Sequence, residues 1–171
     1  MSQIRNGVLL IIVIVFLVVA HFHLRKTSTT YNYIFSPSDL YHHLSNTNFD
    51  LSETGLSKTL EITHKYPGNH RVSIIVEKPV EPGILYDSKF IVKISISNGE
   101  NILFERTVSD SSAWFYGGKD NSGFTLMDYK IQNELLLGAP LSAQITVIEG
   151  NSKFASQYGN QRIVINKIPD E

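Results

Sequence analysis

A continuous apolar segment near the N-terminus is the feature that most constrains this chain. Every residue from Val8 to Ala20 is apolar, and Gly7 and the sequence HFHL extend the segment to Leu24. A helix at the surface of a soluble core carries polar residues along one face, and this segment has none. We therefore expect the segment to enter a membrane rather than join a soluble core.

Two membrane-related interpretations fit this segment. Residues 7–24 reach the lower limit of length for a helix that crosses a bilayer as an uncleaved signal anchor. In the alternative, a signal peptide is cleaved after Ala20 and a soluble secreted domain is released. The polar segment that normally precedes such a cleavage site is missing, and the apolar run continues beyond it. The sequence therefore favours the signal anchor.

The charges that flank the segment decide its orientation only weakly. Arg5 and the α-amino group lie before it, while Arg25 and Lys26 lie after it, so the positive-inside rule finds nearly equal charge on both sides. Because both interpretations are export signals, we predict that the N-terminus lies inside. The C-terminal domain is then extracytoplasmic, and periplasmic if the source is a Gram-negative bacterium.

The chain divides into four predicted parts. Residues 1–6 form a short cytoplasmic head, and residues 7–24 the transmembrane helix or signal peptide. Residues 25–48, rich in Ser, Thr and Asn, read as a stalk in which Ser38 or Asp39 caps a short helical turn through Leu44. Residues 49–171 are long enough to bury a core of their own.

Alternating apolar and polar residues dominate this last part. The sequence KFIVKISIS places Phe90, Val92, Ile94 and Ile96 on one face of a strand, and LSAQITVI alternates in the same way from Leu141. Five further strands are predicted in TLEIT, RVSIIVE, NILFERTV, GFTLMDYKI and QRIVINKI, and turn-forming residues separate them. About seven short strands, each with one apolar face, predict an all-β fold, an antiparallel β-sandwich.

One pair of these strands also predicts a register. A three-residue loop at residues 67–69 would place Ile62 opposite Ile74, and would match apolar with apolar residues along a whole hairpin. The same loop would bring His64 and His70 together at the rim of the core.

The segment FTLMDYKIQNELLLGAPLSAQITVIEG combines an apolar strand, a Gly-x-Pro connection and a cleanly alternating strand. In this it resembles immunoglobulin-like and fibronectin-like modules of envelope proteins, over about the last 120 residues. The resemblance implies an immunoglobulin-like β-sandwich preceded by the N-terminal helix and stalk. There is no Cys pair for Trp114 to pack against, so only the generic sandwich is implied.

Composition excludes several classes of function. The chain has no Cys, which excludes disulfides, thiolate zinc sites and cysteine nucleophiles. From Thr27 onward 12 basic residues face 16 acidic ones, so nucleic acid is not an expected partner. We find no catalytic or cofactor motif, and we predict no cofactor, no metal site and no enzymatic activity. His64 and His70 lack an evident third ligand, so we expect them at a solvated hairpin end.

A long connection at residues 109–123, SDSSAWFYGGKDNSG, contains the candidate binding site. Trp114, Phe115 and Tyr116 are consecutive, and successive residues of an extended loop cannot all point inward. Aromatic side chains on loops are frequent anchors for proteins and sugars. We predict that these three residues and Asp120 contact a partner. In the alternative, Trp114 and Tyr116 fold back over an open end of the sandwich.

Three functions are compatible with these observations. The first is a membrane-tethered, extracytoplasmic, non-enzymatic module that recognises another envelope protein, in an assembly, chaperone-like or immunity-type role. The second is a carbohydrate-binding or adhesive module that uses residues 109–123. The third is a hydrolase whose site is built from scattered carboxylates, for which two acidic residues must face each other across a cleft.

Overall fold

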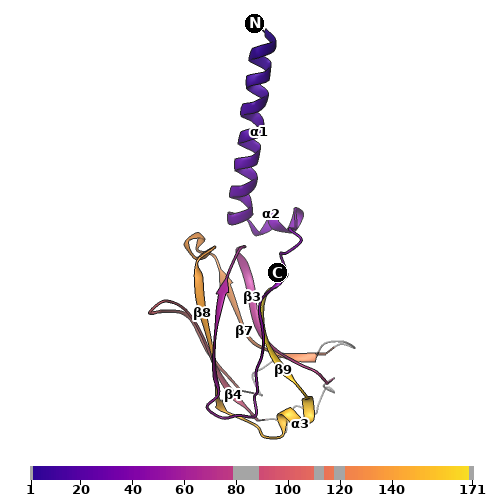
Figure 1. Ribbon diagram of the computed structural model, residues 1–171, viewed down its shortest axis with the longest axis vertical. Helices are drawn as coiled ribbons and strands as arrows, with labels where there is room; N and C mark the ends of the chain where they lie inside the picture. Colours follow the sequence, from indigo (N-terminus) through magenta and orange to yellow (C-terminus); the bar gives the residue numbers. More distant parts are fainter. Residues whose placement is uncertain (1, 79–88, 110–113, 118–121, 170–171) are drawn as a thin grey trace.

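The computed structural model describes residues 2–78, 89–109, 114–117 and 122–169 (Figure 1). The first element, α1 (Ser2–Thr27), stands clear of the rest of the molecule. Its segment Gly7–Thr27 has 21 residues and a mean hydropathy of 2.8, and none of its most apolar stretch is buried. The predicted N-terminal apolar helix is thus confirmed, and it is long enough to span a bilayer or to act as a signal sequence.

Two antiparallel sheets make up the domain that follows. The larger has the strand order β1-β9-β3-β7-β6, and the smaller has the order β2-β8-β4-β5. The strands are β1 (His43–Asn48), β2 (Ser57–Thr63), β3 (Gly68–Val76), β4 (Ile91–Asn98), β5 (Asn101–Ser109), β6 (Trp114–Gly117), β7 (Ser122–Ile131), β8 (Pro140–Glu149) and β9 (Gln161–Lys167). Short helical elements are α2 (Thr29–Ile34), η3 (Glu134–Leu136) and α3 (Phe154–Tyr158).

The apolar faces of the two sheets share one core. On β4, Phe90 (just before the strand), Val92, Ile94 and Ile96 are fully buried, as their alternation predicted. Aromatic rings join the layers: Phe90 meets Phe124 of β7 edge to face with ring centroids 5.9 Å apart. Phe154 of α3 packs against both rings and closes one end of the core. Period-two patterning therefore identified the buried faces correctly.

The predicted hairpin between the second and third strands is wrong. Ile62 of β2 lies opposite Leu141 of β8 in the smaller sheet, whereas Ile74 of β3 lies opposite Phe124 and Ile163 in the larger one. The chain crosses from one layer to the other between Thr63 and Gly68. Two strands in facing layers both turn their apolar residues toward the same core. Their apolar and polar residues therefore alternate in step even though the strands are not hydrogen-bonded to each other.

The segment expected to be a stalk contributes to the domain. Its residues 43–48 form β1, which pairs with β9 at the edge of the larger sheet. The short helix lies earlier than expected, in α2, where Ser28 caps it by accepting a hydrogen bond from the Tyr31 amide, and residues 37–40 form only a turn. Leu40 is buried, so the segment is anchored to the domain.

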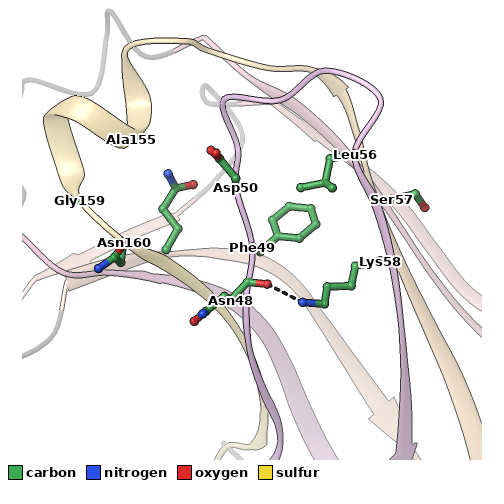
Figure 2. A pocket seen from close by; sticks show the side chains of 10 residues that line it. Asn48, Phe49, Asp50, Leu56, Ser57, Lys58, Ala155, Gly159 and Asn160 are labelled. Atoms are coloured by element: carbon green, nitrogen blue, oxygen red, sulfur yellow. Dashed lines mark hydrogen bonds between the residues drawn. The ribbon is translucent and has the colours of Figure 1, made fainter.

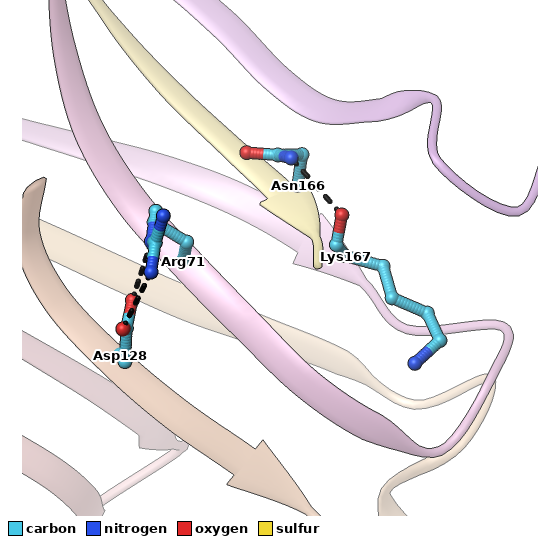
Figure 3. Close-up of polar contacts among 4 residues, drawn as sticks. All are labelled: Arg71, Asp128, Asn166 and Lys167. Carbon is cyan, nitrogen blue, oxygen red and sulfur yellow. Dashed lines mark hydrogen bonds and ion pairs between the residues drawn. The ribbon is translucent and has the colours of Figure 1, made fainter. Parts of the chain in front are cut away.

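The domain has two ends, which we call proximal and distal. The proximal end lies next to α2 and contains the start of β3 and β8, whereas α3 lies at the distal end (Figure 1). On the outer face of the larger sheet, Arg71 donates two hydrogen bonds to the Asp128 carboxylate across β3 and β7, at 2.7 and 2.8 Å (Figure 3). The Asn166 side chain donates to the carbonyl of Lys167 on neighbouring β9.

Candidate functional site

A pocket of about 460 Å³ opens at the distal end of the domain (Figure 2). It lies between the end of β1, the start of β2, the end of α3 and the start of β9, so both sheets contribute to it. Its lining residues are Asn48, Phe49, Asp50, Leu56, Ser57, Lys58, Ala155, Gly159, Asn160 and Gln161. We call it the distal pocket.

Gln161 fixes the back of this pocket. Its side-chain oxygen accepts a hydrogen bond from the Leu51 amide at 2.8 Å, and its backbone carbonyl accepts one from the Phe49 amide at 3.0 Å. The chain after β1 is therefore held against β9. Asp50 shapes the same turn, because its carboxylate accepts hydrogen bonds from both the amide and the hydroxyl of Ser52.

Lys58 closes one side of the pocket. Its ammonium group donates a hydrogen bond to the Asn48 carbonyl at 2.8 Å, and so links the edge strands of the two sheets (Figure 2). The bond satisfies the ammonium only partly, because an ammonium group has three donors. The described structure thus gives the pocket a cation, the Asp50 carboxylate and the side-chain amides of Asn48 and Asn160.

On the side of the pocket opposite Lys58, Gly159 allows the chain to pass close to the Glu77 side chain. Its φ of +74° is a backbone conformation that side chains disfavour, and a Cβ there would lie 2.9 Å from the Glu77 carboxylate. The same carboxylate oxygen accepts a hydrogen bond from the Asn160 amide at 3.1 Å. This contact holds the turn that presents Asn160 to the pocket.

The pocket combines hydrogen-bonding groups with an apolar surface. Its lining offers neutral amides, a hydroxyl, one cation and one carboxylate, and Phe49, Leu56 and Ala155 add an apolar surface. Its volume lies within the range of small-molecule sites, about 300–1,000 Å³. It is equally suited to one or two side chains of a protein partner.

The predicted aromatic site lies elsewhere in the domain. Trp114, Phe115 and Tyr116 belong to β6, an edge strand of the larger sheet, rather than to an open loop. Phe115 takes the register position opposite Phe124, and Trp114 and Tyr116 take the alternate positions opposite Thr125 and Gly123. The structure therefore does not bring these residues together with the distal pocket, which lies at the β1 edge of the same sheet. Asp120 lies outside the described residues.

The two histidines singled out in the sequence do meet, at the proximal end. The rings of His64 and His70 lie edge to face with centroids 4.5 Å apart, and Tyr129 stacks on His70. Both histidines are buried, so the expected solvated hairpin end is not observed. Within the described parts of the chain, no three His, Asp or Glu residues are grouped in a way that could hold a metal ion.

Burial governs the electrostatics of this histidine pair. Nε2 of His64 is hydrogen-bonded to the Tyr129 hydroxyl at 2.9 Å, and its Nδ1 has no partner among the described residues. Loss of hydration lowers the pKa of His64 to about 4, and it raises the pKa of the Tyr129 hydroxyl. Nδ1–H of His70 donates to the Gly68 carbonyl at 3.0 Å. Both rings are thus packed into the proximal core, and the lowered pKa of His64 favours its neutral form.

A polar cluster lies beside that pair. The Asp39 carboxylate accepts hydrogen bonds from Lys65 at 2.8 Å and from the Tyr66 hydroxyl at 2.7 Å. The Lys65 hydrogen bond is the main reason that the pKa of Asp39 is lowered. Burial, together with this carboxylate, raises the pKa of Tyr66 to about 12. These contacts fasten the segment after α2 to the domain.

Comparisons with known proteins identify no family for this chain. No family model matches it, and no curated protein matches it. Among solved structures, a protein of Sulfurospirillum deleyianum is similar over 74% of this chain and 98% of its own length, with 11% identity and a TM-score of 0.49. A GH115 4-O-methyl-alpha-glucuronidase is similar over 72% of this chain and 14% of its own, with 10% identity and a TM-score of 0.37. The P-domain of Penaeus vannamei nodavirus is similar over 72% of this chain and 94% of its own, with 14% identity and a TM-score of 0.28. These similarities carry no conclusion about function.

Sequence reasoning did not find the distal pocket. Its residues come from three short stretches at the ends of strands or helices, near residues 48–50, 56–58 and 159–161, and from Ala155 in α3. Polar residues are common in the turns that follow strands, so none of these stretches is recognisable as part of a binding site from its own sequence. Only the folding of both sheet edges toward α3 brings them together.

Proposed function

We propose that this protein is a membrane-tethered, extracytoplasmic, non-enzymatic module that recognises another envelope protein. The observation that carries the proposal is the position of the distal pocket. The apolar helix α1 leaves the domain at the proximal end (Figure 1), and the lining residues place the pocket at the other end, beside α3. A domain tethered by α1 thus presents the distal pocket away from the bilayer, toward partners in the space outside.

The strand order supports an immunoglobulin-type architecture for this module. Strands β3 to β8 have the neighbours β3-β7-β6 and β5-β4-β8, which is the order of immunoglobulin strands B-E-D and C′-C-F. The first and last strands of the immunoglobulin order, A and G, have exchanged sheets. The strand before this set, β2, lies beside β8, and the last strand, β9, lies beside β3. We propose an immunoglobulin-related sandwich with exchanged outer strands.

We propose the edge strand β6 as a second contact. Trp114, Phe115 and Tyr116 lie on a strand that has one neighbour, β7, in the described sheet. Edge strands offer backbone donors and acceptors to a partner strand, and alternate side chains then give specificity.

Site-specific photo-crosslinking in intact cells tests this function. A benzophenone side chain is placed at Ser57, on the rim of the distal pocket, and in a second variant at Trp114. The matched control is Thr63, an exposed residue at the other end of the same strand β2. We expect the Ser57 and Trp114 variants to crosslink to one protein of the envelope, and Asn160→Ala to weaken the Ser57 crosslink. The Thr63 variant should give none.

Each outcome has a separate meaning. Absence of a crosslink at both Ser57 and Trp114, or equal crosslinks at Thr63, would refute the proposed recognition of an envelope protein. Crosslinking at only one site removes the other from the binding surface. Alkaline carbonate extraction and the intact mass of the same samples test the tether, because a mature N-terminus at His21 would mean that the segment is a cleaved signal.

A carbohydrate ligand is the second candidate function, and the amide-rich lining of the distal pocket favours it. Amide and carboxylate side chains beside an apolar surface match the alternating hydroxyl and C–H surfaces of a sugar. The test is binding of the full-length protein to a glycan array. Binding that Asn160→Ala abolishes would show that a carbohydrate, and not an envelope protein, is the ligand of this pocket.

A further inference from the structure

Several large apolar side chains are exposed at the proximal end of the domain. Outside α1, Ile34 has 66% of its surface exposed, Phe35 has 54% and Leu135 has 83%. Ile34 ends α2 and Phe35 follows it, whereas Leu135 lies in η3, a hundred residues further along the chain. The connection that contains η3 joins β7 to β8 at the end of the domain where α2 lies (Figure 1). Two separate segments thus carry exposed apolar residues at this end of the domain.

The contacts of α2 set its direction relative to α1. The His21 ring of α1 is hydrogen-bonded through Nδ1 to the Tyr31 hydroxyl, and the two rings meet edge to face. Phe35 also packs on Tyr31, with ring centroids 4.8 Å apart. Together these contacts hold α2 across the axis of α1 (Figure 1). An α1 that crosses a bilayer would therefore leave α2 lying along its surface.

The chemistry of this region is that of a membrane boundary. The helix α1 ends at Thr27, and α2 begins only two residues later. Arg25 and Lys26 lie in the last turn of α1, at the level where lipid phosphates would lie. Tyr31 joins an apolar ring to a polar tip, the combination that is enriched at membrane interfaces. Phe35 donates its backbone amide to the Tyr31 carbonyl, so this backbone donor is satisfied near the apolar phase.

We propose that Ile34, Phe35 and Leu135 form a lipid-contacting rim. In this arrangement the proximal end rests on the bilayer that α1 crosses, with these side chains at the boundary between headgroups and acyl chains. The inference rests on the membrane tether of the proposed function. Because α2 begins two residues after α1 ends and lies across it, Ile34 and Phe35 stay close to the end of the membrane-spanning segment, and this identifies lipid as the occupant. The rim fixes the tilt of the domain and keeps the distal pocket directed away from the membrane.

Site-directed spin labelling tests this arrangement directly. Because the chain contains no Cys, each single-cysteine variant receives one nitroxide label without background. The full-length protein is reconstituted in vesicles of phosphatidylethanolamine and phosphatidylglycerol, with labels at Val13 in α1, at Phe35 and at Leu135. Ser156 in distal α3, an exposed residue, provides the aqueous control. Collision of each label with oxygen, which concentrates in lipid, is compared with collision with a water-soluble nickel complex.

We expect the balance to favour oxygen strongly at Val13, moderately at Phe35 and Leu135, and nickel at Ser156. A label at Val13 that favours nickel would overturn the membrane tether itself. If Val13 lies in lipid while Phe35 and Leu135 favour nickel, the tether stands and the rim is refuted. Spin–spin broadening at Phe35 that disappears on dilution with unlabelled protein would also refute it, because a second copy would then cover the rim.

Discussion

Replacement of Ile94 by Ala measures how much stability the shared core provides. Ile94 lies on β4 with none of its surface exposed, between Arg106 of β5 and Ile145 of β8. The substitution removes three buried carbon groups, each of which contributes about 0.8 kcal/mol through its transfer from water. The residual cavity adds to this loss, so we expect the free energy of unfolding to fall by about 3–4 kcal/mol.

The same hairpin provides a matched control. Ile102 on β5 has 61% of its surface exposed, so Ile102→Ala makes the same chemical change with little loss of burial. We expect it to cost about 1 kcal/mol at most. Both variants lose the same β-branched side chain from a strand, so the difference between them, about 2 kcal/mol or more, reports burial.

Urea unfolding of the full-length protein in micelles, followed by the circular dichroism of the β domain, gives both values. The comparison requires that the denaturant dependence stay the same in all variants. Equal losses at the two positions, or a loss below about 1 kcal/mol at Ile94, would show that the inward face of β4 has been assigned wrongly.

Two further predictions concern the proximal end. Because the folded-state pKa of His64, about 4, lies below the ordinary value of 6.5, the unfolded chain binds the extra proton as the pH falls. Stability should therefore drop by roughly 2 kcal/mol between pH 7 and pH 5 on account of this residue. Urea titrations at both pH values should show a smaller drop for His64→Gln and an unchanged drop for the exposed His42→Gln. The second prediction compares fragments 37–171 and 49–171. The shorter fragment lacks β1 and the buried Leu40, so we expect it to be about 3 kcal/mol or more less stable, and equal stability would show that β1 adds nothing to the larger sheet.

Local patterns in the sequence determined the buried faces and the apolar helix. Whether a residue such as Ile94 points inward depends on the alternation of its own strand, because successive side chains lie on opposite faces. The helix α1 was equally predictable, since an apolar run without a polar face is a property of one segment.

Pairing between strands could not be read in this way. Ile62 and Ile74 have the same apolar pattern whether they are neighbours in one sheet or face each other across the core, and the structure has them in different sheets. The weak alternation of residues 43–48 gave no sign of β1, because an edge strand needs few apolar residues and its hydrogen bonds come from distant β9.

The environments of particular side chains were also decided only by the tertiary structure. The sequence predicted that His64 and His70 meet, but from a hairpin that the structure does not contain. It could not show that Tyr129, from a distant strand, packs against both rings. The distal pocket depends on the same kind of contact, because Lys58 and Gln161 lie about a hundred residues apart and meet only where two sheet edges converge on α3. Side-chain alternation is fixed by the geometry of each strand, whereas a binding site requires segments far apart in the chain to be packed together.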